Sequence, residues 1–147
     1  MPRGEKDRRY YPGLMPHEAE VWREWLVDHE LEWNRFEYDV LVGPGVEPTP
    51  EFLKAFPETG AAVGERFRNA TRKRIDCVGY KGPMVALFEV ENRIEPVALG
   101  QILAYRQLWI KDRGLRGPLR LYLVARELSP GMDIALAPFP IRVNLVG

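Results

Sequence analysis

The strongest constraint on the fold is a pair of apolar segments joined by a very short connection. Residues 74–80 and 84–93 both have the composition of strands, and only Lys81, Gly82 and Pro83 separate them. A three-residue connection that contains glycine is typical of a β-hairpin. The sequence therefore predicts an antiparallel strand pair near the middle of the chain.

A helix, a strand, a short helix and a loop are predicted on the N-terminal side of this hairpin. Apolar residues at helical spacing predict a helix over residues 16–29. Alternation over residues 33–42 predicts a strand with one apolar face. That face is expected to carry Phe36, Tyr38, Val40 and Val42. A capped helix is expected over residues 49–56, and the glycine-rich residues 57–65 are expected to form a loose loop.

The C-terminal half predicts a long helix and two further strands. The helix is expected to begin at Pro96 and to continue to about Asp112, with Gly114 as its C-cap. Residues 119–125 form an almost uninterrupted apolar strand, and residues 141–146 form a last strand. Between these two strands a loop with a short helical turn is expected.

This order of elements predicts an α/β fold with a mixed β-sheet and flanking helices. The chain has 147 residues, which fits one domain. We expect a polar N-terminal arm over residues 1–13 and a single domain over residues 14–147.

The composition leaves carboxylates as the groups that could carry acid–base or metal chemistry. Cys77 is the only cysteine, which excludes an internal disulfide and a zinc site built from several cysteines. The two histidines, His17 and His29, have no spacing typical of a ligand pair. The formal net charge is zero, so bulk positive charge does not favour nucleic acid. No apolar run is long enough for a membrane span, and a cytoplasmic protein is expected.

Three carboxylates fall close together at the open end of the predicted hairpin. Asp76 and Glu89 lie roughly opposite each other, and Glu91 shares a strand face with Glu89 and Arg93. Carboxylates this close repel each other unless a cation neutralises them, and oxygen ligands suit Mg²⁺ or Mn²⁺. The alternative interpretation is a solvated strand face, because Glu37 and Asp39 show the same alternation.

Residues 72–125 resemble the core of the PD-(D/E)XK nuclease superfamily, especially its RecB-like and phage-encoded branches. The matching segments are IDCVGYKG, VALFEVENR and ALGQILAYRQLW. The resemblance implies a restriction-endonuclease-like core with Asp76 and Glu89 as the two acids. It also implies that Gln101 and Tyr105 form the Gln-x-x-x-Tyr motif of the following helix. These two residues lie one helical turn apart, on the same helix face.

In one respect the sequence departs from the family. Glu91 stands where the family has a lysine, which gives a variant Glu-x-Glu motif. Glu91 could then act as a base or as a ligand of a second metal, while Arg93 or Lys73 could supply the missing positive charge. The same change could also mark a site that has lost catalysis.

The resemblance implies metal-dependent hydrolysis of DNA phosphodiester bonds, in DNA processing or recombination. Asp76, Glu89 and the carbonyl of Val90 would hold the metal, and Glu20 of the first helix is considered as a further acid. A cluster of arginines is expected to contact the nucleic-acid backbone without reading sequence. Its members are Arg66, Arg68, Arg72 and Arg74.

The competing hypothesis is a nuclease-like fold that has lost its activity and serves as a structural or interaction module. A phage head-completion or head–tail connector protein is one such module. This hypothesis implies a homo-oligomer or a larger particle, and location in a virion instead of the cytoplasm. A metal at the acidic residues or a ring of subunits would distinguish the two.

Overall fold

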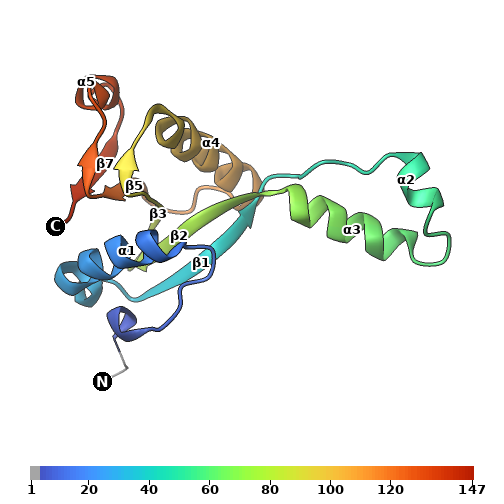
Figure 1. The fold of residues 1–147 in the computed structure, drawn as a ribbon, viewed down its shortest axis with the longest axis horizontal. Helices are drawn as coiled ribbons and strands as arrows, with labels where there is room; N and C mark the ends of the chain where they lie inside the picture. The colour runs from blue at the N-terminus through green and yellow to red at the C-terminus, as the bar shows by residue number, and fades with distance from the viewer. Residues whose placement is uncertain (1–3) are drawn as a thin grey trace.

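The structure, a computed structural model, describes residues 4–147 and contains one five-stranded mixed sheet with helices on both faces (Figure 1). The strand order is β1-β2-β3-β5-β7. Their bounds are Arg35–Val42 for β1, Lys73–Lys81 for β2, Met84–Val90 for β3, Leu119–Ala125 for β5 and Ile141–Leu145 for β7. The first three strands are antiparallel, whereas β3, β5 and β7 are parallel. The predicted hairpin and the predicted fold class are confirmed.

The helices and the smaller elements lie between these strands. The helices are α1 (Pro16–His29), α2 (Pro50–Lys54), α3 (Gly60–Thr71), α4 (Pro96–Arg113) and α5 (Met132–Leu136). Two short strands, β4 (Arg93–Ile94) and β6 (Glu127–Leu128), form a separate parallel pair. Gly114 caps α4 with φ 76°, a left-handed value that favours glycine, as the sequence predicts.

Helix α1 covers one face of the sheet with aromatic side chains. Trp22 and Trp25 are almost completely buried and pack edge-on against Phe88 of β3. The indole N–H of Trp25 donates to the side-chain oxygen of Asn144 in β7, at 2.9 Å. The first helix is therefore fixed to the last strand of the chain.

Helix α4 covers the opposite face and is the crossover between the parallel strands β3 and β5. Its side chains Ile102, Tyr105 and Trp109 belong to an apolar cluster with Leu87 of β3 and Leu121 of β5. Because β3 and β5 are parallel, their carboxyl ends lie side by side, near the N-terminal end of α4.

The alternation of β1 changes direction at Asp39, contrary to the prediction of one apolar face. Phe36 and Tyr38 pack with the α1 cluster, but Val40 and Val42 are buried on the α4 side. Asp39 has φ 54°, a left-handed value that aspartate tolerates better than most residues. This backbone conformation reverses the pleat, so the prediction for residues 36–42 is wrong in its second half.

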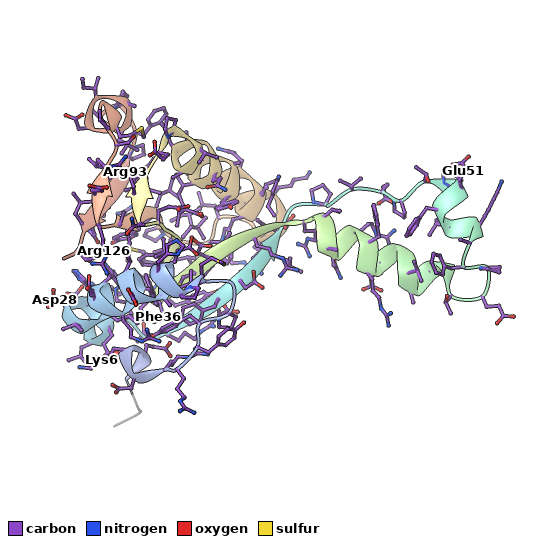
Figure 2. All side chains as sticks on the ribbon, in the orientation of Figure 1. Lys6, Asp28, Phe36, Glu51, Arg93 and Arg126 are labelled. Atoms are coloured by element: carbon purple, nitrogen blue, oxygen red, sulfur yellow. The ribbon has the colours of Figure 1, made fainter. Side chains whose placement is uncertain are left out.

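Residues 57–65 were expected to form a loose loop, which is wrong for most of the segment. Helix α3 begins at Gly60 and forms, with α2, a hairpin that projects away from the sheet (Figure 1). Gly64 is buried in α3, where Leu53 and Pro48 lie within van der Waals distance of the position of a Cβ atom. Glu51 lies at the far tip of this hairpin in Figure 2.

The N-terminal segment packs along the domain within the described residues. Tyr11 is 1% exposed, and its hydroxyl donates to the carbonyl of Glu5. Arg23 of α1 donates to the carbonyls of Arg8 and Arg9. Residues 1–3 of the expected arm lie outside the described residues.

Within residues 4–147, no helix is long and apolar enough to cross a membrane.

Candidate functional site

The two predicted acids of the hairpin lie on paired strands at one end of the sheet. The register pairs Cys77 with Phe88, so the next residues along each strand, Asp76 and Glu89, follow at the open end. The backbone N–H of Val90 donates to Oδ2 of Asp76 at 2.8 Å. This hydrogen bond holds the Asp76 carboxylate against the end of β3.

Glu89 is the most deeply buried of the acids, with 5% of its surface exposed. Its Oε2 atom has no hydrogen-bond partner within residues 4–147. Burial, and secondly the Asp76 charge, raises the pKa of Glu89. Burial is also the main cause that raises the pKa of Asp76. In the absence of a cation, this pair therefore retains a proton that separate carboxylates would lose.

Glu91 lies just beyond β3, and its backbone N–H donates to the carbonyl of Val124 in β5. Burial and then the nearby charge of Glu18 raise the pKa of the Glu91 side chain. Glu18 is in the first turn of α1, where its Oε1 accepts from the backbone N–H of Met15 at 2.8 Å. The helix end therefore contributes a fourth acid.

Of the acids of α1, Glu18 and not the expected Glu20 acts on the carboxylates of the hairpin. Glu20 is exposed, and its charge acts on the pKa of Arg126. Glu18 instead contributes to the raised pKa of Asp76, of Glu89 and of Glu91. The available signal was the position of Glu18 three residues after the N-cap, which fixes its side chain at the helix terminus.

Helix α4 brings Gln101 and Tyr105 to the same region. Tyr105 is 6% exposed, and the pKa of its phenol is raised by burial and then by the charges of Glu89, Asp76 and Glu91. The Oε1 atom of Gln101 is buried and has no hydrogen-bond partner within the described residues. The predicted helix motif and the three hairpin acids thus meet in one place.

Of the two cations considered for this region, only Lys73 lies near it. Lys73, Gln101 and Tyr105 line one pocket of about 330 Å³, together with Val97, Gly100 and Ala104. Arg93, which Figure 2 labels, belongs to β4 and not to β3. Its guanidinium donates to the carboxylate of Glu127 at 2.8 Å. The prediction that Arg93 shares a strand face with Glu89 is therefore wrong.

The predicted metal site would have few side-chain ligands. Within residues 4–147, no three His, Cys, Asp or Glu side chains are arranged as a metal site. The predicted set contains only two such side chains, Asp76 and Glu89, and adds the carbonyl of Val90. The unpartnered Oε2 of Glu89 is an acceptor that a hard cation would satisfy. The residues present therefore fit Mg²⁺ or Mn²⁺.

The four predicted backbone-binding arginines are spread over two elements. Arg66 and Arg68 lie on α3, Arg72 is its C-cap, and Arg74 lies in β2. Three of them form ion pairs within the protein. The pairs are Arg68 with Glu47, Arg72 with Asp112 and Arg74 with Asp39.

Comparisons of the chain with family models, with curated proteins and with solved structures find no match.

Proposed function

We propose that this chain is a metal-dependent deoxyribonuclease of the PD-(D/E)XK type, with its site at Asp76, Glu89, Glu91, Gln101 and Tyr105. The observation that carries the proposal is the pair of buried, unpartnered acceptors Glu89 Oε2 and Gln101 Oε1 beside three carboxylates with raised pKa values. Buried acceptors are rarely left without a partner, and a cation would supply one.

Each residue of the site would have a separate role in hydrolysis of the phosphodiester. A bound Mg²⁺ or Mn²⁺ supplies neutralisation of phosphate charge and lowers the pKa of water. Asp76, Glu89 and the carbonyl of Val90 would hold the metal. Glu91 would take the proton of the attacking water while the water oxygen bonds to phosphorus and the ester P–O bond breaks. Solvent would protonate the alkoxide that leaves.

Glu91 is suited to this role by its surroundings. Half-burial and the charge of Glu18 raise the pKa of its carboxyl, and a carboxylate with a raised pKa is a stronger base. Lys73 opens onto the pocket shared with Gln101 and Tyr105, where its ammonium group could contact a phosphate of the bound strand. The positive charge that the family places at position 91 would then come from the neighbouring strand.

The proposal is tested by metal binding and by cleavage together. We expect Mg²⁺ or Mn²⁺ to raise the melting temperature of the wild type and to activate cutting of plasmid or single-stranded DNA. Asp76→Asn and Glu89→Gln should lose the metal-dependent rise in melting temperature. They should also cut at about a hundredth of the wild-type rate or less, because a bound metal lowers the activation barrier by about several kcal/mol.

Glu127→Gln is the matched control, because Glu127 is an exposed acid paired with Arg93 outside the site. It should retain both properties. The proposal would be wrong if neither metal changed the melting temperature of the wild type and the wild type cut no form of DNA.

A second candidate function is supported by the projecting α2–α3 hairpin. Phe52 and Phe56 pack together near its tip but remain more than a third exposed. Exposed aromatic side chains on a projection suit contact with another protein. The alternative is a structural or interaction module, such as a head-completion or connector protein. Sedimentation analysis distinguishes it, because a ring of subunits would have a multiple of the monomer mass.

A further inference from the structure

A row of cations crosses the sheet at the end remote from the acidic residues. In the register, Lys81 lies opposite Met84, Arg120 lies beside Ala86, and Arg142 lies beside Tyr122. Directly paired residues share a sheet face, and so do alternate residues of one strand. The side chains of Lys81, Arg120 and Arg142 therefore share the α1 face, on the part of the sheet beyond the buried Phe88 and Tyr122.

Two of these three cations have no carboxylate partner within residues 4–147. Arg120 and Arg142 are exposed and form no ion pair there, whereas the ammonium of Lys81 pairs with Glu32 at 3.9 Å. The guanidinium of Arg142 lies 6.0 Å from the ring centre of Tyr122. Like charges on adjacent strands repel each other and destabilise the sheet. A bound anion would remove that repulsion.

Two hollows follow this row, and neither is lined by an acid. One hollow, of about 320 Å³, is lined by Lys81, Met84, Arg120, Tyr122 and Arg142. The other, of about 470 Å³, shares Arg120 and Arg142 but is otherwise lined from the α4 side of the sheet, by Arg106, Leu119, Leu121 and Ile141 among others. We call the three cations of the α1 face, Lys81, Arg120 and Arg142, the cationic strip.

We propose that the cationic strip binds the phosphate backbone of a nucleic-acid strand without reading its sequence. From β2 to β7 the strip spans three strand spacings, or about 14 Å. Phosphates of one strand recur about every 3.4 Å along a duplex, so the strip faces several of them, more than a single small anion needs. Two of its three members are arginines, whose planar donor groups match phosphate oxygens.

The strip extends the proposed function, since it places nucleic acid at a second location on the sheet. It shares no residue with the acidic site, so its test does not depend on cleavage. The test measures fluorescence anisotropy of a labelled 20-nucleotide single strand, and of its duplex, in EDTA and at 50–200 mM salt.

The double variant Arg120→Gln with Arg142→Gln should bind DNA at least tenfold more weakly than the wild type. Its salt slope should fall by about 2, because two phosphate contacts are lost. The matched variant Arg9→Gln with Lys54→Gln removes the same charge from exposed positions outside the strip and the acidic site, and it should change affinity less than twofold. Melting temperatures should confirm that both variants fold, since all four side chains lie at the surface.

Several outcomes would overturn the inference. A wild type that does not bind DNA would contradict the inference. Equal loss of affinity in the strip variant and in the matched variant would show that only bulk charge attracts DNA. A strip variant that changes the mass of the DNA-free protein would make the strip an interface between copies. Binding that depends on the strip, without cleavage in either metal, would sustain this inference and remove the proposed nuclease function.

Discussion

Glu91 is the single side chain on which the proposed activity most depends. It replaces the positive charge of the related motif with a negative one, next to Glu18. If it is a working base, Glu91→Lys removes the proton acceptor, and the rate of DNA cutting should fall on the order of 10²-fold or more. Steady-state cleavage assays in Mg²⁺ and in Mn²⁺ measure this change.

A rise in cutting by Glu91→Lys would contradict this role and indicate a decayed lysine site. Glu91→Gln serves as the companion variant, because it keeps the size of the side chain and removes only its basicity. Both variants should be slow if basicity matters.

The buried pair of Asp76 and Glu89 should make the metal-free protein sensitive to pH. Burial raises both pKa values in the folded state above their usual values near 4, so the folded state binds protons more tightly than the unfolded state. The corresponding stability is present in full below about pH 4 and is lost as the pH rises through the folded-state pKa values. In Glu89→Gln, a permanently neutral side chain should remove much of this loss.

Urea unfolding in EDTA between pH 4.5 and pH 8.5 measures the effect. Stability should decline more steeply with pH in the wild type than in Glu89→Gln. Glu37 has the opposite tendency, because a hydrogen bond from Tyr80 lowers its pKa, but it is present in both proteins and cancels. Parallel pH profiles would contradict the assignment of the buried proton to this pair.

Among the helices, α1 makes the contact whose loss is easiest to measure. Trp25 is 1% exposed and stacks with Trp22 and His29. Trp25→Ala should lower the free energy of unfolding by on the order of 3–5 kcal/mol, because it leaves a large cavity. Chemical denaturation measures this loss, and Trp25→Phe should lose less. Unchanged stability in Trp25→Ala would place the helix elsewhere.

The sequence predicted best those elements whose ends are marked by local chemistry. Pro16 and Pro96 mark the first turns of α1 and α4, and Gly114 marks the end of α4, so these helices match their predicted limits closely. Helix α3 was missed because Gly60 and Gly64 resemble loop residues. The packing of Leu53 and Pro48 against Gly64, which joins α3 to α2 and its preceding segment, cannot be read from local sequence.

The candidate site was predictable to a similar degree. The hairpin spacing brought Asp76 and Glu89 to the same end of the sheet, and one helical turn brought Gln101 beside Tyr105. The preference for Glu18 over Glu20 could have been predicted, because Pro16 marks the start of α1 and so places Glu18 in its first turn. The reversal at Asp39, by contrast, depends on a backbone angle that aspartate permits but does not require.

For the whole molecule, the α2–α3 hairpin should be removable. Its base is closed by a hydrogen bond of 2.6 Å from the N–H of Val46 to the hydroxyl of Thr71. Replacing residues 47–70 by a short Gly-Ser linker should leave the melting temperature within a few degrees, because the hairpin contributes little to either apolar cluster of the sheet. Calorimetry measures this, and failure to fold would show that the hairpin is part of the core.

The same deletion also separates the two candidate functions. A nuclease whose acids lie on β2 and β3, outside residues 47–70, should still bind Mg²⁺, whereas an assembly module should lose its oligomeric mass. Sedimentation of the deleted and intact proteins, each with a Mg²⁺ titration of the melting temperature, compares both properties.

The bond between Trp25 and Asn144 has a consequence for how the chain is made. Its two partners are 119 residues apart, so the ribosome adds Asn144 about 6–24 s after Trp25, at roughly 5–20 residues per second. During this interval the antiparallel strands β1, β2 and β3 are available to pair, but α1 lacks part of its docking surface. The hydrogen bond that fixes α1 to the last strand therefore forms only when synthesis is nearly complete, after β1 and β3 have supplied Phe36 and Phe88 to the aromatic face of α1.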